Sequence, residues 1–309
     1  MGFSIILGLL VITGLVAYQA MHSASVGFKE YREMARDTNL SGRVQANMLM
    51  VRMNVKDYII TASDKDKAQF EEYWGRTSKF MAEAQKEIND PKRAKMINEV
   101  DQLLTEYRAG FKQVVDLIAR RNDIVYETLN KRGPSIEKDL TKILLSSKKD
   151  NDMSAAYEAS LATRSLLLAR LYSGKFLDTN DNAAVERVHQ EFKQMAKHLK
   201  VLDRELQNPQ RRALLSKVAE GKKVYEKAFD DVVKTITTRN DIIKNTLDRI
   251  GPKVATDIEK VKLEIKGVQD TLGPQLQDSN DHATLVIGLC VLLALFLGAF
   301  IAYFITRST

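Results

Sequence analysis

The sequence has few residues that interrupt helices and almost none that form covalent cross-links. It contains 5 prolines and 15 glycines in 309 residues, which is few for a turn-rich β fold and favours long helices. Cys290 is the only cysteine, so the chain can form neither an internal disulfide nor a cysteine-based metal cluster. Hydrophobic residues make up 44% and charged residues 28% of the chain, which excludes a largely disordered protein.

Motifs that carry chemistry are also scarce. The four histidines form no HExxH pattern, and the sequence has no glycine-rich phosphate loop. The net charge is +7, but basic and acidic residues are interleaved, so no basic arm indicates nucleic-acid binding. We therefore expect a protein that is not an enzyme, with no catalytic residues, no metal site, no cofactor and no nucleic-acid partner.

Two apolar segments enclose one large polar region. Residues 3–20 and 283–305 contain no charged side chain, and a membrane-spanning helix needs about 20 apolar residues. We predict transmembrane helices over 1–20 and 283–305. The first segment is also short enough for a signal peptide, but no basic stretch precedes it and no small-residue cleavage site follows it. Long loops cross a membrane largely regardless of their charge, so residues 21–282 are expected to be extracytoplasmic.

The polar region is an internal duplication with an offset of 118 residues. The segment Arg121-Asn122-Asp123-Ile124 recurs as Arg239-Asn240-Asp241-Ile242, and Gly133-Pro134 recurs as Gly251-Pro252. Fifteen of the 36 positions in 107–142 are identical to the equivalent positions of 225–260, whereas about two matches are expected by chance. Arg52 in the first copy corresponds to Arg170 in the second. A match of this density identifies two copies of one structural plan.

Each copy is predicted to form three helices joined by short turns. Turn residues lie at 61–64, 89–91, 180–181 and 208–209, and short turns make consecutive helices antiparallel neighbours. Apolar residues recur at helical spacing in the three helices of copy one, and we predict that they form its core. They are Val44, Met48, Val51, Val55, Tyr58, Ile59, Phe70, Trp74, Met81, Ala84, Ile88, Leu104, Tyr107, Phe111, Val114, Ile118, Val125 and Leu129.

The helix lengths predict an all-α protein of six helices arranged as two stacked four-helix bundles. Helix one covers 22–62, helix three extends to about 149, and helix six covers 210–280. Each copy then lends its last segment to the other bundle. The proximal bundle takes about 22–130 and 250–282, and the distal bundle takes about 131–249. Gly273-Pro274 is either a hinge in helix six or its end at the membrane surface, and we favour the second interpretation.

This layout of span, duplicated helical loop and span resembles the helical bimodular sensor domain of bacterial methyl-accepting chemotaxis receptors. Its recognisable segments are the apolar opening at 2–8, Arg52 with 58–60, and the Gly133 and Gly251 segments. The resemblance implies a two-pass protein of the bacterial inner membrane that binds a small organic acid. It also implies a homodimer that signals to cytoplasmic chemotaxis proteins through a linker starting at 306–309, with a signalling region that these residues do not include.

Two other functions stay open. The same sensor domain occurs on histidine kinases, where it reads a ligand or a periplasmic solute-binding protein. A membrane-anchored helix bundle that only tethers is the second alternative. Ala294, Gly298 and Ala302 recur every four residues in the second span, a spacing that suits close packing of two helices in a dimer and also suits small residues that face lipid.

Arg52 and Arg170 are the first candidates for ligand binding. A guanidinium can hold a planar carboxylate through two parallel hydrogen bonds, although an isolated helical arginine is more often solvated or ion-paired. The resemblance places ligand-binding arginines on this helix. The family's second arginine, three residues further on, is Val55 in copy one and Ser173 in copy two.

A second group of candidates comes from the repeated Arg-Asn motif. Asn122 and Asn240 fall on apolar stripes, where an asparagine either fixes helix register or binds a ligand. Arg121 and Arg239 precede them, and Thr238 adds a hydroxyl group. We predict that Arg121, Asn122, Thr238, Arg239 and Asn240 also belong to the ligand-binding site.

Overall fold

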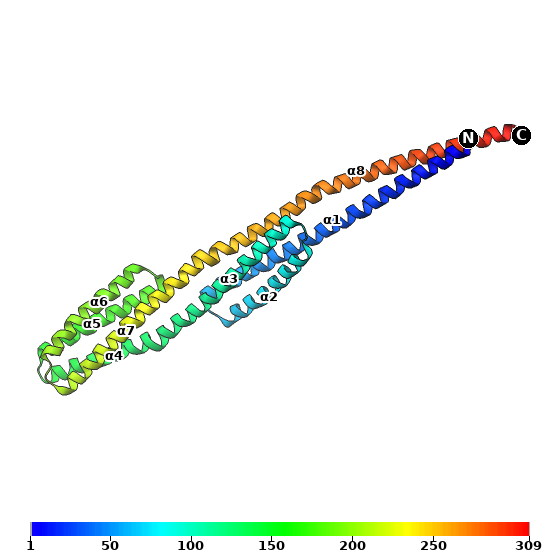
Figure 1. Ribbon diagram of the computed structural model, residues 1–309. Coiled ribbons are helices and arrows are strands. Elements are labelled where there is room, and N and C mark those ends of the chain that lie inside the picture. Colours follow the sequence, from blue (N-terminus) through cyan, green and yellow to red (C-terminus); the bar gives the residue numbers. More distant parts are fainter. Residues whose placement is uncertain (1, 309) are drawn as a thin grey trace. The chain divides into compact units, whose positions relative to one another are not determined.

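The structure is a computed structural model that describes residues 2–308, and it is built from helices (Figure 1). In chain order the elements are α1 (Gly2–Thr61), α2 (Asp64–Glu87), α3 (Pro91–Asp123), η1 (Ile124–Leu129), α4 (Asn130–Lys149), α5 (Met153–Thr179), α6 (Asn182–Glu205), α7 (Pro209–Ile242), η2 (Ile243–Leu247) and α8 (Asp248–Ser308). The elements η1 and η2 are π-helical turns inside longer helices, so the ten elements form six continuous helices. No strand occurs in residues 2–308, and the predicted all-α class with six helices is confirmed.

Capping side chains stop and restart the helices at the turns predicted from the sequence. The side chain of Ser63 accepts a hydrogen bond from the backbone N–H of Asp66 at the start of α2, and Asp181 caps α6 by accepting from Ala183. Asn208 accepts from the backbone N–H of Arg211 before α7. Asn180 ends α5 in the left-handed conformation, with φ 58°, which asparagine adopts more readily than most residues.

The chain divides into two compact units. Unit 1 combines Met1–Thr105 with Ile250–Thr309, and unit 2 is Glu106–Arg249. Unit 1 therefore contains the last segment of copy two, and unit 2 contains the last segment of copy one. The first division lies after Thr105, earlier in the chain than the position near 130 that the helix lengths indicated.

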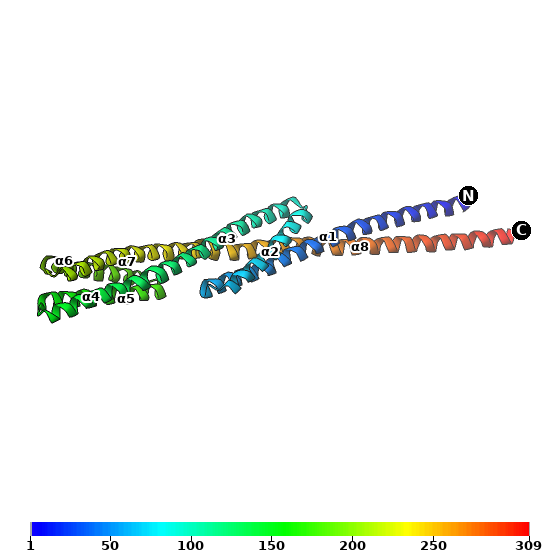
Figure 2. The ribbon, with the colours of Figure 1, turned by 90° about the horizontal axis from the view of Figure 1, so that it is seen from below.

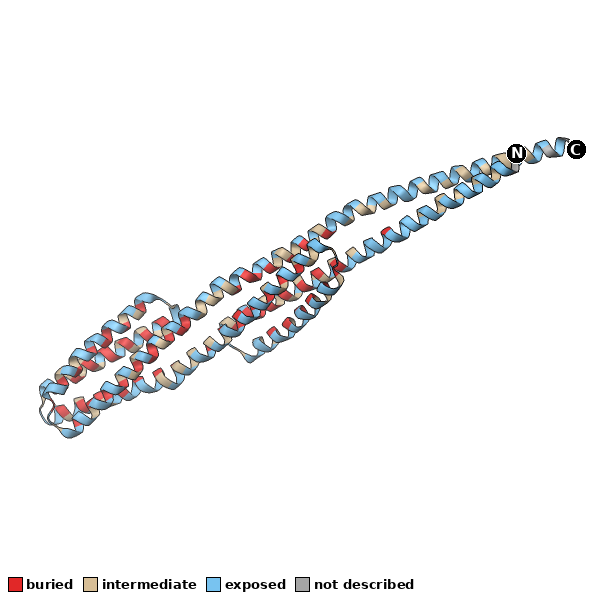
Figure 3. Cartoon of the chain, in the orientation of Figure 1, coloured by how far each residue is buried: buried red, intermediate tan, exposed pale blue. Residues whose placement is uncertain are grey.

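Unit 1 contains α1, α2, the first part of α3 and most of α8. The Gln45 side chain on α1 donates to Glu259 on α8 over 3.0 Å, and the Arg43 guanidinium lies over the Phe80 ring of α2. Where the helices meet, the predicted core residues of α1 and α2 are buried, apart from Ile59, which is only partly buried. Figure 3 shows these buried positions along the inner faces of the helices.

Unit 2 contains the rest of α3, the two π-helical turns, and α4 to α7. Two views of the molecule show α4, α5, α6 and α7 side by side (Figures 1 and 2). Phe176 meets Phe229 edge to face at 5.9 Å between ring centroids, and Phe192 lies 5.4 Å from Tyr225. The predicted core residues from Tyr107 to Leu129 are all buried.

Prolines lie inside the long helices without ending them. The structure places Pro134 within α4 and both Pro252 and Pro274 within α8. The favoured prediction that helix six ends at Gly273-Pro274 is therefore wrong. A proline removes one backbone hydrogen bond, and a helix that is hydrogen-bonded on both sides continues across that single gap.

Two parts of the chain are long and apolar enough to cross a membrane. One is the stretch of α1 near the N-terminus, and the other belongs to the continuous helix that ends in α8; their apolar windows are not buried in the protein. Between them and the core of unit 1, α1 and α8 approach closely at Gly27. A Cβ added at Gly27 would lie 2.1 Å from a methyl carbon of Leu276, so a larger residue here would require the Leu276 side chain to move.

Candidate functional site

In unit 1, Arg52 crosses the backbone of α8 at Gly251. Arg52 is half-buried on α1, and a Cβ added at Gly251 would lie 2.8 Å from its Nε and 3.0 Å from its Cδ. Carbon and nitrogen atoms without a bond between them prefer separations near 3.5–4.0 Å. The absence of a side chain at position 251 therefore provides the space in which the arginine lies.

Unit 2 repeats this contact with the equivalent residues. A Cβ added at Gly133 would lie 2.6 Å from Nε and 2.9 Å from Cδ of Arg170. Arg52 and Gly133 belong to copy one, whereas Arg170 and Gly251 belong to copy two. Each contact thus joins an arginine of one copy to the lent segment of the other, which gives the repeated Arg and Gly-Pro motifs one common structural role.

Neither guanidinium is paired in the described part of the chain. Salt bridges and side-chain hydrogen bonds are present around both units, yet none between described residues involves Arg52 or Arg170. A half-buried cation without a carboxylate has lost part of its hydration and has gained no opposite charge. Such a group is suited to receive an anion from outside the protein.

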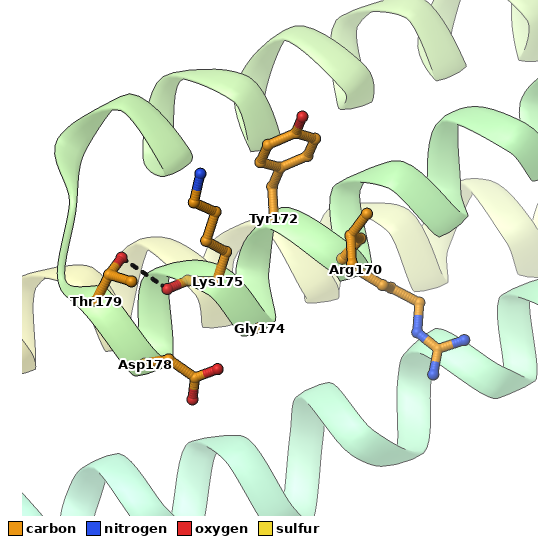
Figure 4. Close-up of a pocket in the computed structure, with 7 residues that line it drawn as sticks. Arg170, Tyr172, Gly174, Lys175, Asp178 and Thr179 are labelled. Carbon is orange, nitrogen blue, oxygen red and sulfur yellow. Dashed lines mark hydrogen bonds between the residues drawn. The ribbon is translucent and has the colours of Figure 1, made fainter.

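Arg170 also lines a groove together with other residues of α5. A groove of about 630 Å³ is lined by Arg170, Leu171, Tyr172, Gly174, Lys175, Asp178 and Thr179. Figure 4 shows the Arg170 guanidinium directed toward the neighbouring helix below it, while Tyr172 and Lys175 point to the opposite side. Thr179 donates to the backbone carbonyl of Lys175. The lining side chains of this groove therefore do not converge on one point, and Asp178 is the labelled residue that lies on the same side of α5 as the Arg170 guanidinium.

The buried Tyr225 lies near Arg170. It is 3% exposed, and burial raises the pKa of its phenol, while a hydrogen bond with Ser173 and the charge of Arg170 act in the opposite direction. The influence of Arg170 places the guanidinium near the phenol. A guanidinium with a neutral tyrosine and a serine beside it can hold one carboxylate group. In copy one the position equivalent to Ser173 is occupied by Val55, which is buried. The contact of Arg52 with Gly251 therefore has no hydroxyl equivalent to that of Ser173.

Both Arg-Asn motifs lie in unit 2, where the charge of Arg121 acts on Arg239. Arg121 donates to Asn122 over 3.0 Å, and Arg239 donates to Asn240 over 2.9 Å. Both Arg239 and Asn240 also donate to the side-chain oxygen of Asn180, over 3.2 and 3.0 Å. We call these five residues the arginine–amide cluster.

The cluster differs from the set predicted by sequence in two members. The sequence indicates only a turn at Asn180, which in the structure is the left-handed C-cap of α5 and accepts hydrogen bonds from Arg239 and Asn240. Thr238 is exposed, and among the described residues no hydrogen bond connects it to the cluster. Arg52 and Arg170 lie outside the cluster, in the two arginine–glycine contacts.

No metal centre accompanies these sites in the described residues, where no group of three or more His, Cys, Asp or Glu side chains could hold an ion.

A comparison with protein families finds one family whose model matches the N-terminal part of the chain. The family described as a four helix bundle sensory module for signal transduction matches residues 1–145. Residues 1–145 are thus similar in sequence to the sensory module of methyl-accepting chemotaxis proteins, and in the structure they contribute to both unit 1 and unit 2. No curated protein sequence matches the chain. The match includes the first apolar segment, copy one and its segment in unit 2, and it indicates a sensory module for signal transduction.

Proposed function

We propose that the chain is the sensor region of a transmembrane chemoreceptor that binds a small carboxylate through Arg170, with Arg52 as the equivalent anchor in unit 1. The observation that carries this proposal is the repeated contact in which a half-buried, unpaired guanidinium lies over a glycine. The family match supplies the sensory class, and the arginines supply the ligand chemistry.

Arginine is well suited to binding a carboxylate. Its planar guanidinium presents two parallel N–H groups to a carboxylate, and hydrogen bonds between opposite charges are about twice as strong as neutral ones. Tyr225 and Ser173 stand beside Arg170 and would complete the site in unit 2. The apolar Val55 leaves unit 1 with less polar support, so the stronger carboxylate site is expected at Arg170.

The membrane arrangement follows from the two apolar helices. Residues 21–282 lie outside the cytoplasm in this proposal, and both ends of the chain lie on the cytoplasmic side of a bacterial inner membrane. The helix that begins at Pro209 continues through η2 and α8 to Ser308. A ligand bound in unit 2 therefore acts on the same helix that enters the second span, provided that it binds one helix position better than another.

Signal output requires partners beyond this chain. We propose a homodimer in which the second spans pack through Ala294, Gly298 and Ala302, and a cytoplasmic output that engages chemotaxis signalling proteins. A histidine kinase output, or a periplasmic binding protein as the recognised ligand, uses the same sensor architecture.

A thermal-shift screen of the full chain in detergent micelles tests the ligand class. Small carboxylates are compared with their uncharged amides. A carboxylate at 100 times its dissociation constant should stabilise the protein by about 2.7 kcal/mol, and its amide should give no shift. If no carboxylate raises the unfolding temperature, or if amides act equally well, the proposed ligand class is wrong and a tethering bundle becomes the better account.

A further inference from the structure

Two equivalent arginines at the starts of α3 and α7 have different surroundings. Arg93 in unit 1 corresponds to Arg211 in unit 2, 118 residues later. Arg211 donates to Ser147 over 3.0 Å and lies 3.2 Å from the carboxylate of Asp150 in the turn after α4. The position equivalent to Ser147 is Ile265, and α8 continues beyond it to Ser308. Unit 1 therefore offers Arg93 neither that hydroxyl nor that turn.

Four buried polar atoms at this end of unit 1 have no hydrogen-bond partner among residues 2–308. They are Nε and Nη1 of Arg93, Oγ1 of Thr38 and Oγ of Ser41, and Ser41 is 0% exposed. Buried hydroxyl groups in other helices donate to a carbonyl of their own helix, as Thr77 does to Tyr73 over 2.8 Å. Thr38 and Ser41 on α1 make no such bond, so their hydroxyl groups are available to another group.

Contacts between the helices bring this part of α1 to the turn that carries Arg93. Arg36 on α1 pairs with Glu87 at the end of α2 over 2.7 Å. The turn that follows contains Asp90, whose carboxylate lies 3.5 Å from Nε of Arg93, which is too long for a hydrogen bond of normal geometry. The arginine is 13% exposed, so it lies at the inner side of this turn.

The repeat supports the same placement. Three polar positions of α1 correspond to three buried alanines of α5: Asp37 to Ala155, Thr38 to Ala156 and Ser41 to Ala159. In unit 2 this face lies beside the arginine, because Asp152 accepts from the backbone N–H of Ala155 over 3.1 Å and lies 3.7 Å from Arg211. Copy one thus carries polar side chains at positions where copy two, whose arginine is already paired, carries alanine.

We propose that this end of unit 1 binds ordered water between α1 and α3, with Thr38, Ser41 and Arg93 as its protein partners. A buried water makes about three hydrogen bonds to polar groups that otherwise lack a partner. The guanidinium donates, and each hydroxyl group can donate or accept. An anion suits the site less well, because the neighbouring Asp37 carries the same charge.

Solvent has access to this part of unit 1. A groove of about 580 Å³ follows α1 and the end of α2, and its lining includes Arg36 and Leu40, the sequence neighbours of Asp37 and Ser41. Bonds through water are nearly as favourable as direct ones. Water therefore joins α1 to α3 in unit 1, where the equivalent end of unit 2 has direct bonds to its arginine.

A crystal structure of the full chain that resolves ordered solvent tests the site directly. A solvent oxygen should lie within about 3.2 Å of Nη1 of Arg93 and of the hydroxyl group of Ser41 or Thr38. The proposal is overturned if protein atoms occupy these hydrogen-bonding positions or if no solvent oxygen is found there.

Thermal unfolding of the full chain in nanodiscs gives a second test, in which the sign of the change decides. Ser41→Ala and Thr38→Val should each lower the unfolding temperature by about 2–4 °C, because each removes a partner of the water and leaves a buried donor of Arg93 unpaired. Removing a hydroxyl group that binds nothing would instead raise it. Thr77→Val is the matched control, because that hydroxyl group bonds within its own helix, and it should not unfold below the wild type.

Two outcomes of this second test contradict the proposal. One is that both Ser41→Ala and Thr38→Val unfold at or above the wild-type temperature. The other is that chloride, compared with gluconate at equal ionic strength, stabilises the wild type more than Ser41→Ala, which would assign the site to an anion. Neither outcome concerns Arg170 or a carboxylate ligand, so the proposed function is tested separately.

Discussion

The contacts between Arg52 and Gly251 and between Arg170 and Gly133 predict a separation of stability from ligand binding. An alanine Cβ at position 133 would lie 2.6 Å from Nε of Arg170, and one at position 251 would lie 2.8 Å from Nε of Arg52. Both distances are well below the preferred separation of about 3.5–4.0 Å, so Gly133→Ala and Gly251→Ala must each displace the arginine.

The expected effect on stability is small because its contributions oppose each other. Alanine favours a helix over glycine by about 1 kcal/mol. A Cβ before proline clashes with the proline ring in a helical backbone, which offsets part of that gain. The displaced atoms belong to a flexible side chain, which moves at low cost. We expect the free energy of unfolding to change by no more than about 1 kcal/mol.

The expected effect on binding is larger. A displaced guanidinium loses a charge-assisted hydrogen bond worth about 1.5–3 kcal/mol, so a carboxylate bound at Arg170 should bind about 10- to 150-fold more weakly to Gly133→Ala. Thermal unfolding and calorimetry of the full chain measure the two quantities. Gly75→Ala is the control, because a Cβ there meets nothing within 4 Å. Unchanged affinity in Gly133→Ala would refute the idea that the glycine positions the arginine.

Three further changes test other parts of the structure. Burial raises the pKa of Asp37 in the folded protein above its unfolded value, so the folded state gains stability as the pH falls through the folded-state pKa. Asp37→Asn should therefore unfold at a higher temperature than the wild type at pH 7 and lose this advantage toward pH 4. A lower unfolding temperature of the variant at pH 7 would contradict this prediction. Arg211 is 6% exposed and bonds to Ser147, so Arg211→Ala should cost about 2 kcal/mol, whereas the exposed neighbour variant Arg212→Ala should cost less than about 1 kcal/mol in the same denaturant titration. Gly27→Ala should separate α1 from α8 and weaken disulfide crosslinking between cysteines introduced on the two helices near this contact, and unchanged crosslinking would show that the contact is not tight.

The repeat made most of the fold predictable. Helical spacing identifies the buried faces, and the offset of 118 residues relates Arg52 to Arg170 and Gly133 to Gly251 from the sequence alone. The turns were predictable because Ser63 and Asn208 are residues that cap helices.

The details that decide the candidate sites depend on contacts between helices, and spacing along one chain does not encode these contacts. The passage of Arg170 over Gly133 depends on the register of two packed helices. Asn180 joins the arginine–amide cluster from the left-handed C-cap of α5, by accepting a hydrogen bond from Asn240 on α7. The π-helical turns η1 and η2 occupy equivalent places in the two copies, but helical periodicity does not distinguish a π-helical turn from an α-helical one.

The most direct test of the central claim is a calorimetric titration of a stabilising carboxylate into the full chain and two of its variants in nanodiscs. Arg170→Ala removes the proposed anchor, and Arg164→Ala removes an exposed arginine of the same helix. Binding should weaken about 10- to 150-fold in Arg170→Ala and stay at the wild-type level in Arg164→Ala. Equal affinities in all three proteins would contradict the assignment of Arg170 as the ligand anchor.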